Sequence, residues 1–419
     1  MKDKQNKIDR RRFLKTMGAA GFAPAFAGVT KAEPNEPNAA EKQKLQYPQV
    51  PKRVLGKTGV RISSLAIGGG VDYVNNQILL RKAYQWGINF WDTCDVYVGG
   101  KSEIGIGEYL AKNPEIRKNL FLSTRAFDGP DFVGPNARGA DDVEKRLQQS
   151  LKRMNTSYID LYGIHAISDP SELTDELKEW VRSAKKRKLI RFFGFSTHKN
   201  IPNVLTAVSR MDWIDAVMTM YNFRLMHDSR MPPAVDACHK AGIGLIAMKI
   251  QAFQRRQEID SPINMKVIEH FTAKGFTEGQ AKLKVVLQDE RFSSACVGME
   301  NVALLTTNVV AVLDKTELTQ ADMNVFKEYA EATCSGYCTA CAEICDSVLP
   351  DTPCISEIAR YLMYYNSYGQ RERARELFAK IPQKTRNKLL STDYSPAQAR
   401  CPQRIPIAEM VAEAVDKLA

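Results

Sequence analysis

Short apolar runs alternate along the chain with longer segments in which apolar residues recur at helical spacing. The runs are rich in β-branched and aromatic residues and are short enough to be strands rather than helices. Polar segments of helical period, such as Val143–Met154 and Leu173–Lys186, separate them. The pattern predicts eight strands, at Arg61–Ile67, Ile88–Cys94, Leu120–Thr124, Ile159–His165, Phe192–Ser196, Ala216–Tyr221, Gly244–Lys249 and Ser294–Gly298.

Strands that are apolar throughout and are separated by helices indicate a parallel sheet covered on both faces. Eight such units over about 250 residues fit a closed (β/α)8 TIM barrel of the α/β class. An open doubly wound sheet is the alternative, and its dinucleotide-binding form needs Gly-x-Gly-x-x-Gly directly after the first strand. Gly68-Gly69-Gly70 lacks this spacing, and Gly105-Ile106-Gly107 follows no strand. The pattern therefore favours the barrel.

The N-terminus reads as a targeting segment. Arg10-Arg11-Arg12-Phe13-Leu14-Lys15 precedes a weakly apolar run, and Ala25-Phe26-Ala27 offers a small-x-small cleavage site. This arrangement resembles a twin-arginine export signal over residues 1–27, which implies a periplasmic or other extracytoplasmic destination. A basic, fraying N-terminal helix is the alternative. Residues 28–50, rich in proline and charge, read as a linker.

Charge and composition narrow the function classes. The 419 residues are 44% hydrophobic and carry a formal charge of +11. Residues 1–27 hold seven Lys/Arg and two Asp, which leaves +6 on the rest of the chain. No long basic stripe remains, so nucleic acid is a poor candidate partner. No run of about 18 apolar residues occurs, so we expect no membrane span in the mature protein.

Polar residues follow several predicted strands at the end where such barrels carry their chemistry. A phenol beside a permanent cation can have a lowered pKa and can act as an acid and base. A carboxylate could hold the cation in place, and an imidazole could orient a carbonyl oxygen. The residues at these strand ends are Asp92, Tyr97, Arg125, His165, Ser196, His198, Asn222 and Lys249.

Several motifs resemble those of the aldo-keto reductase family. They are Leu55-Gly56-Lys57-Thr58-Gly59, Ile88-Asn89-Phe90-Trp91-Asp92-Thr93 with Tyr97, Asp160-Leu161-Tyr162-Gly163-Ile164-His165, and Gly194-Phe195-Ser196-Thr197-His198. The resemblance covers about residues 51–315. It implies an NAD(P)H-dependent carbonyl/alcohol oxidoreductase with an Asp, Tyr, Lys, His tetrad, to which Asp92, Tyr97 and His165 correspond.

The third tetrad position departs from the family pattern. Leu122-Ser123-Thr124-Arg125 stands where the family has Leu-Ser-Thr-Lys. Arginine keeps the charge but replaces a compact ammonium with a planar fork. Two hypotheses follow: an active reductase in which Asp92 and Arg125 tune Tyr97, or a relic barrel that serves as an electron-transfer or binding module.

The resemblance also implies cofactor positions. Ser196 and Asn222 would hold the nicotinamide amide, while Gly298 and Asn308 would lie near the adenosine phosphate. No Lys or Arg occurs from Gly298 to Asn308, so NAD and NADP both remain open. Lys249 would contact the pyrophosphate or the substrate, and its alternative role is that of a solvated strand-end lysine.

The last 89 residues carry clustered cysteines. The spacing Cys-x3-Cys-x2-Cys-x3-Cys, followed by a distant Cys-Pro, resembles a ferredoxin-type loop that binds a [4Fe-4S] cluster. A zinc site and short-loop disulfides are the alternatives. Which four of the candidate ligands would bind the cluster is open. The candidates are Cys334, Cys338, Cys341, Cys345 and Cys401.

Other tail features complete the predicted organisation. Leu349–Tyr365 and Ile407–Leu418 are predicted helices around the cysteines, and Cys94, Cys238 and Cys296 are expected to be buried small apolar residues in the barrel. We expect a barrel at 51–330 and an α-helical [4Fe-4S] extension at 331–419. The expected protein is an exported oxidoreductase with a small carbonyl or sugar-like substrate and a redox partner protein.

Overall fold

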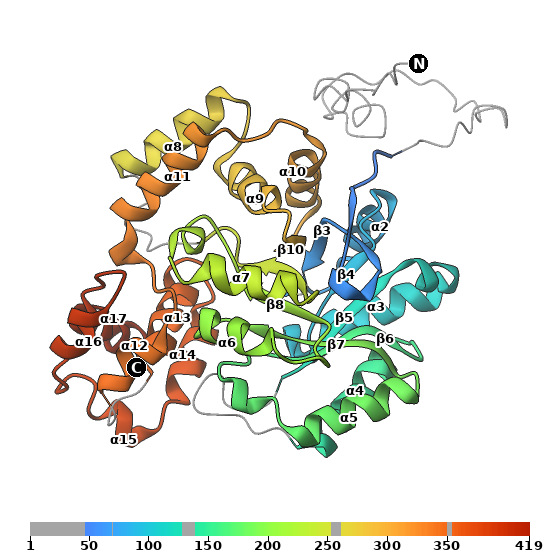
Figure 1. The fold of residues 1–419 in the computed structure, drawn as a ribbon, viewed down its shortest axis with the longest axis horizontal. Helices are drawn as coiled ribbons and strands as arrows, with labels where there is room; N and C mark the ends of the chain where they lie inside the picture. Colours follow the sequence, from blue (N-terminus) through green and yellow to red (C-terminus); the bar gives the residue numbers. More distant parts are fainter. Residues whose placement is uncertain (1–46, 69, 128–138, 253–260, 350–353) are drawn as a thin grey trace, which may run out of the picture.

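Eight parallel strands form a closed barrel, in the order β10-β3-β4-β5-β6-β7-β8-β9 (Figure 1). The computed structural model describes residues 47–68, 70–127, 139–252, 261–349 and 354–419. The predicted (β/α)8 barrel is confirmed. Its strands are β3 (Leu65–Gly68), β4 (Phe90–Asp92), β5 (Phe121–Ala126), β6 (Ile159–Ile164), β7 (Ile190–Thr197), β8 (Ala216–Met220), β9 (Gly244–Met248) and β10 (Phe292–Gly298).

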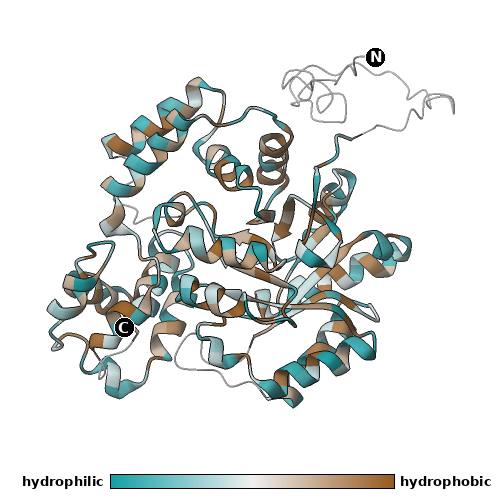
Figure 2. Ribbon diagram, in the orientation of Figure 1, coloured by the Kyte–Doolittle hydropathy of each residue, from teal (hydrophilic) through white to brown (hydrophobic). Residues whose placement is uncertain are grey.

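Helices cover the outside of the barrel and turn their apolar faces towards it (Figure 2). In α4, for example, Val143, Leu147 and Leu151 lie one turn apart and are all buried. Helices α8 (Pro262–Ala273) and α11 (Gln320–Ala332) pack against each other beside this ring. The covering helices are α2 (Gln77–Gln85), α3 (Lys101–Lys112), α4 (Ala140–Arg153), α5 (Asp175–Lys186), α6 (Ile201–Val208), α7 (Met231–Lys240), α9 (Glu278–Gln288) and α10 (Val302–Leu313).

A two-stranded hairpin closes the N-terminal end of the barrel. Strands β1 (Lys52–Val54) and β2 (Arg61–Ser63) pair antiparallel. Leu55 and Ile62 are fully buried and pack with the residues that fill the barrel interior. The single strand predicted at 61–67 is therefore wrong. The chain leaves the hairpin after Ser63 and enters the barrel only at Leu65, because the two segments pair with different partners.

The N-terminal boundary of the barrel lies inside the predicted linker. Val50 is buried, and its amide donates to the Trp86 carbonyl oxygen at 2.9 Å. The end of segment 28–50 thus packs as part of the fold. The predicted signal segment, 1–27, lies outside the described residues.

The C-terminal extension has a hydrophobic core of its own. Predicted helix 407–418 matches α17, whereas α13 begins at Ile355 and not at Leu349; residues 350–353 lie outside the described residues. Tyr361 and Ala374 are fully buried in this core. The extension helices are α12 (Ala342–Cys345), α13 (Ile355–Asn366), α14 (Arg371–Ala379), α15 (Gln383–Arg386), α16 (Ser395–Arg400) and α17 (Ile407–Leu418).

The extension docks on loops at the C-terminal face of the barrel, beside α6 (Figure 1). The Asn200 amide donates to the Ala340 carbonyl oxygen at 2.9 Å. The Lys199 ammonium pairs with Glu357 at 2.6 Å. Lys199 and Asn200 lie just after β7 in the chain. The extension therefore sits over the end of the barrel where the strand-end residues converge. Among the described helices, none is both long enough and apolar enough to cross a membrane.

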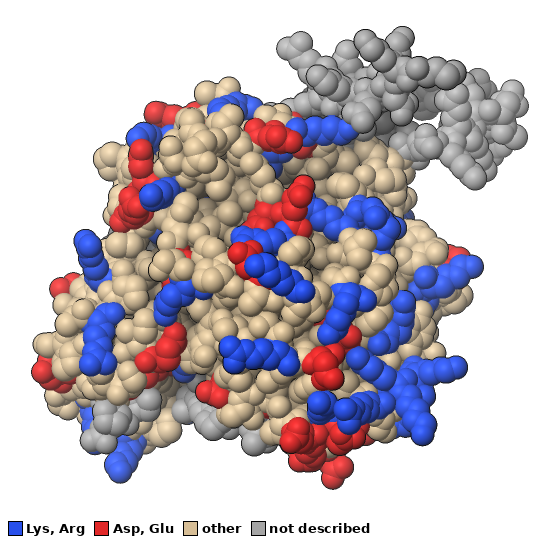
Figure 3. Space-filling view, in the orientation of Figure 1, with Lys and Arg blue, Asp and Glu red and all other residues tan. Residues whose placement is uncertain are grey.

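The surface in the view of Figure 3 carries basic and acidic side chains interspersed. On that face they form no continuous basic stripe, in keeping with the modest charge of the chain after residue 27.

Candidate active site

Asp92 and Arg125 form a buried, bidentate ion pair at the barrel mouth. Asp92 ends β4, and Arg125 lies near the end of the neighbouring strand β5. The two guanidinium nitrogens donate to the two carboxylate oxygens at 2.5 and 2.8 Å. Only 4% and 2% of the Arg125 and Asp92 side chains are exposed. The planar fork of arginine fits this parallel geometry, which an ammonium could not reproduce.

Tyr97 stands beside this pair on a tight turn. It opens the 3-10 turn η3 (Tyr97–Gly100), in which Val98, Gly99 and Gly100 all have positive φ, at 51°, 63° and 88°. A β-branched residue rarely adopts this region, so Val98 is strained. The turn holds the Tyr97 ring at the barrel mouth, nearly perpendicular to the ring of a second candidate residue, His165.

The Tyr97 phenol has a raised pKa, contrary to the expected lowering. Burial raises it most, and the Arg125 charge only partly offsets this effect. Asp92, paired with Arg125, also raises the pKa of Tyr97. The phenol therefore stays protonated at neutral pH, which suits a proton donor.

A row of rings leads from Tyr97 towards the extension. The centroid of His165, which follows β6, lies 5.9 Å from that of Tyr97 and 5.6 Å from that of His198. His198 follows β7. Burial, and then the nearby Arg360 charge, lower the pKa of His198 well below its ordinary value. His198 is thus a neutral imidazole at neutral pH.

Of the expected nicotinamide residues, Asn222 is already fully engaged. Its amide nitrogen donates to the Lys249 carbonyl oxygen at 3.2 Å and to the Tyr337 hydroxyl oxygen at 3.0 Å. Its amide oxygen accepts from the backbone amides of Arg224 and Leu225 at 3.0 and 3.2 Å. An asparagine amide has two donors and two acceptor positions. All four are used, and the side chain is buried.

The other expected cofactor residues are spread around the mouth. Ser196 lies within β7, where its hydroxyl oxygen accepts from the Ala166 amide at 3.0 Å. Gly298 ends β10 and is exposed, and Asn308 is buried on α10. Lys249 follows β9 and turns towards the extension. Its ammonium lies 5.7 and 5.1 Å from two tyrosine ring centroids of the extension, those of Tyr364 and Tyr368.

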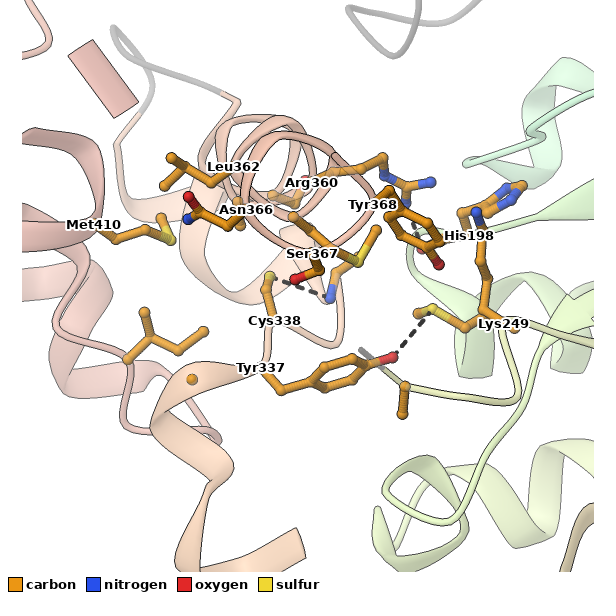
Figure 4. A pocket seen from close by; sticks show the side chains of 18 of the residues that line it. His198, Lys249, Tyr337, Cys338, Arg360, Leu362, Asn366, Ser367, Tyr368 and Met410 are labelled. Atoms are coloured by element: carbon orange, nitrogen blue, oxygen red, sulfur yellow. Dashed lines mark hydrogen bonds between the residues drawn. The ribbon is translucent and has the colours of Figure 1, made fainter. Parts of the chain in front are cut away.

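A cavity lies between the barrel mouth and the extension (Figure 4). His198, Met220 and Lys249 line it from the barrel, and no acidic side chain is among the described lining residues. Apart from Cys338, a predicted cluster ligand, sequence reasoning missed the extension residues of this wall, because only the docking of the tail brings them to the mouth. Those drawn in Figure 4 include Tyr337, Cys338, Arg360 and Tyr368.

The tail cysteines are free thiols, four of which are neighbours. The structure contains no disulfide among the nine cysteines, all of which lie in described segments. Burial, together with the neighbouring thiols of Cys341 and Cys401, raises the pKa of Cys338 to about 12. Cys401 is one of the neighbouring groups that raise the pKa of Cys338, Cys341 and Cys345. Cys334 is not one of them. Within the described residues, no group of three or more His, Cys, Asp or Glu side chains could hold a metal ion.

The barrel cysteines follow expectation in two of three cases. Cys94 and Cys238 are fully buried. Cys296 is only partly buried, and its thiol contacts an Asp92 carboxylate oxygen at 3.6 Å. Cys296 is therefore a neighbour of the candidate site rather than a simple core residue.

The geometry defines a barrel with an enzyme-type site at its C-terminal face. The model of the Aldo/keto reductase family matches residues 64–331, more than half of the chain. The chain therefore belongs to the aldo/keto reductase family.

Two curated relatives are similar to part of this chain. L-galactose dehydrogenase of Arabidopsis thaliana is 25% identical over an alignment of 294 residues, and the match covers 64% of this chain and 89% of that protein. A putative voltage-gated potassium channel subunit beta of Schizosaccharomyces pombe is 30% identical over an alignment of 141 residues, and the match covers 32% of this chain and 41% of that protein.

Solved structures show the same fold. Aldo-keto reductase AKR11C1 from Bacillus halodurans, in its holo form, superposes with a TM-score of 0.54 at 21% identity and covers 67% of this chain and 96% of its own. The thermostable aldo-keto reductase Tm1743, in complex with the inhibitor epalrestat, gives a TM-score of 0.54 at 24% identity and covers 66% and 98%.

Proposed function

We propose that the protein is an oxidoreductase that interconverts a carbonyl and an alcohol at the barrel mouth. The observation that carries the proposal is the convergence of the Asp92–Arg125 pair, Tyr97 and His165 from neighbouring strand ends. Family membership supports it. The substrate class is a small carbonyl or sugar-like compound.

Each site residue has a role in this proposal. The protonated Tyr97 phenol donates a proton to the carbonyl oxygen during reduction and recovers it during oxidation. Arg125 stabilises the negative charge left on the Tyr97 oxygen. Asp92 positions Arg125 through two hydrogen bonds. His165, beside the Tyr97 ring, orients the substrate oxygen.

A nicotinamide dinucleotide, NAD or NADP, is the proposed redox cofactor, and when bound it supplies or accepts the hydride. Ser196 and Asn222 have the donors and acceptors that a carboxamide needs, although Asn222 is engaged by Tyr337 in this arrangement. Lys249 is the nearby charge for a phosphate group. The proposal covers both dinucleotides because no basic residue occurs between Gly298 and Asn308.

Replacement of the phenol tests this function. We expect Tyr97→Phe to lower kcat for carbonyl reduction by at least about 10²-fold, since general acid catalysis contributes about that much. The measurement is steady-state turnover with a panel of aldehydes and sugars. Tyr158→Phe is the control, because Tyr158 precedes β6, at the opposite end of that strand from His165, and its ring lies against the Arg117 guanidinium. Equal turnover in the wild type and Tyr97→Phe contradicts the proposal.

A non-catalytic electron-transfer or binding module is the second candidate function. Two features favour this function. The Asn222 side chain is hydrogen-bonded to Tyr337, and Arg125 stands where the family has a lysine. Arg125→Lys separates the two functions. A large gain in turnover indicates a relic site, and a loss shows that Arg125 belongs to a working one.

We further propose a [4Fe-4S] cluster in the extension, as an electron carrier or a structural group. Cys338, Cys341, Cys345 and Cys401 are the proposed ligands, supported by their neighbourhood and by the absence of disulfides among the nine cysteines. A cubane is larger than one ion, so thiols that cannot reach a single metal ion can still serve it.

Counting iron and sulfide in protein purified without oxygen tests the cluster. We expect about four of each per chain, as a [4Fe-4S] cluster requires. Cys401→Ser should lose them, and Cys334→Ser, the matched control, should keep them. Wild-type protein without iron, or equal loss in both variants, contradicts the ligand assignment.

Export by the twin-arginine route is the remaining part of the proposal, carried by Arg10-Arg11 and the apolar run that follows. Replacing both arginines with lysine should retain the precursor inside the cell. Unchanged export of this variant contradicts the proposal.

A further inference from the structure

Tyr337 of the extension occupies a hydrogen-bonding position on Asn222. The Tyr337 hydroxyl oxygen accepts from the Asn222 amide at 3.0 Å and donates to the Met220 sulfur at 3.5 Å. Tyr337 is buried at the cavity wall, with its hydroxyl turned towards the barrel (Figure 4). The contact joins residues 115 positions apart in the chain.

Tyr337 is held there from the barrel side as well. The Arg224 guanidinium lies 5.2 Å from the Tyr337 ring centroid. The same guanidinium donates to the Thr333 hydroxyl at 2.8 Å. Arg224 lies two residues after Asn222, so side chains of one barrel loop contact the start of the extension at both Thr333 and Tyr337. Because several contacts converge, the Tyr337 position is defined by the fold.

A nicotinamide carboxamide needs a donor and an acceptor from its site. Asn222 offers neither while Tyr337 is in place, because its other three positions are bonded to backbone groups. Of its partners, only Tyr337 lies outside the barrel domain. We infer that Tyr337 and the carboxamide of a nicotinamide dinucleotide compete for Asn222. This inference rests on the proposed function, which assigns Asn222 to that cofactor.

Competition makes Tyr337 a determinant of cofactor affinity. The apparent dissociation constant equals the intrinsic one divided by the fraction of time that Tyr337 spends away from Asn222. We expect displacement of Tyr337 to disturb the segment that carries Cys338 as well, because the two residues are adjacent in the chain. Occupancy of the cofactor position and placement of the cysteine loop are therefore linked.

Titration of the full-length protein, purified without oxygen, with NADH and separately with NADPH tests the competition. Tyr337→Phe retains the ring but removes the hydroxyl on Asn222, and we expect it to bind one dinucleotide about threefold to tenfold more tightly than wild type. Tyr337→Ala also removes the ring, and we expect a larger gain. Tyr365→Phe is the matched control, because Tyr365 lies on α13 beside Arg371 and Lys417. It should bind as wild type does.

Hydrogen–deuterium exchange gives a readout that needs no variant. Saturating dinucleotide should speed amide exchange in residues 333–341 of the wild type, because Tyr337 leaves its place. A ligand that simply packs against the segment would slow exchange there, and this result overturns the inference.

The outcomes separate the inference from the function on which it rests. If wild type and both Tyr337 variants bind a dinucleotide equally well, the competition is wrong and the proposed cofactor stands. If none of them binds either dinucleotide while circular dichroism shows that all are folded, both the competition and the nicotinamide assignment are wrong.

Discussion

The pairing of Arg125 with Asp92 depends on the planar shape of the guanidinium group. Both of its terminal nitrogens bind Asp92 in a site from which water is nearly excluded. A lysine would satisfy one carboxylate oxygen and leave the other buried without that bond. We expect Arg125→Lys to lower the free energy of unfolding by about 1–3 kcal/mol, measured by urea denaturation.

The matched control is a surface arginine in a pair of similar length. Arg182 and Glu179 are 59% and 67% exposed and lie 2.5 Å apart. Arg182→Lys should cost less than about 0.5 kcal/mol, because exposed pairs contribute little. If both lysine variants cost the same, the buried pair contributes nothing beyond an ordinary surface contact.

His198 makes stability depend on pH. Its folded-state pKa is lowered by burial, so the unfolded chain binds a proton more readily. The stability that His198 contributes is therefore present above the unfolded pKa of about 6.5 and is lost as pH falls below it. We expect the free energy of unfolding to fall more steeply between pH 7 and 5 in wild type than in His198→Gln. The exposed His239 supplies the control, since His239→Gln should keep the wild-type slope.

At the scale of elements, the hairpin that closes the barrel depends on one glycine. Gly56 has φ of +47°, and a Cβ there would lie within 2.4 Å of backbone atoms at Gly242 and Gly244. Gly59 also has positive φ, at +69°, but a Cβ there would meet nothing within 4 Å. The positive φ destabilises both alanine variants, because alanine rarely adopts it. Only in Gly56→Ala does the added Cβ also clash with neighbouring backbone.

The difference between these two variants isolates the clash. We expect Gly59→Ala to cost about 1 kcal/mol and Gly56→Ala at least about 2 kcal/mol more, by urea denaturation. Equal costs would show that the hairpin is free to move away from β9.

Hydrophobic periodicity predicted most of the barrel strands and helices. It failed where the boundary of a strand depends on which neighbouring strand it pairs with. Strands such as Ile159–Ile164 are continuous apolar runs, and their length and composition suffice. The division of 61–68 into hairpin and barrel strands could not be read, because both parts are equally β-rich and only their partners differ. Helices α14 to α16 are short and polar outside a few core positions, so their pattern is weak.

At the scale of the whole molecule, a buried ion pair holds the extension to the barrel. Glu357 on α13 is 2% exposed and binds Lys199, which is 19% exposed. Removing the cation leaves a buried carboxylate without its partner. We expect Lys199→Met to raise amide exchange in α13 at least tenfold while the barrel strands keep their protection.

A surface lysine tests whether this effect is specific. Lys266 pairs with Glu328 at 2.7 Å, and both side chains are more than half exposed. Lys266→Met should leave exchange in α13 unchanged. An unchanged pattern in Lys199→Met as well would mean that other contacts hold the extension.

Only the part of the candidate site that the order of the strands brings together could be predicted from the sequence. Asp92, Tyr97, Arg125 and His165 follow successive strands, so closing the barrel brings them together. The pKa of Tyr97 was predicted in the wrong direction, because the burial of a phenol cannot be read from a motif. The contact of Tyr337 with Asn222 depends on the packing of Tyr337 in a cluster with Phe223 and residues of α8, α9 and α11, which joins segments far apart in the chain and which no local pattern encodes.

The hairpin also has a kinetic consequence. Leu55 and Ile62 fill one end of the barrel, so a molecule bound in the cavity at the other end lies beside the extension. The residence time of any bound molecule is then governed by how often the extension loosens. Changes at docking contacts away from Asn222, such as the pair of Lys199 with Glu357, should therefore alter association and dissociation rates together and leave their ratio, the equilibrium affinity, nearly constant.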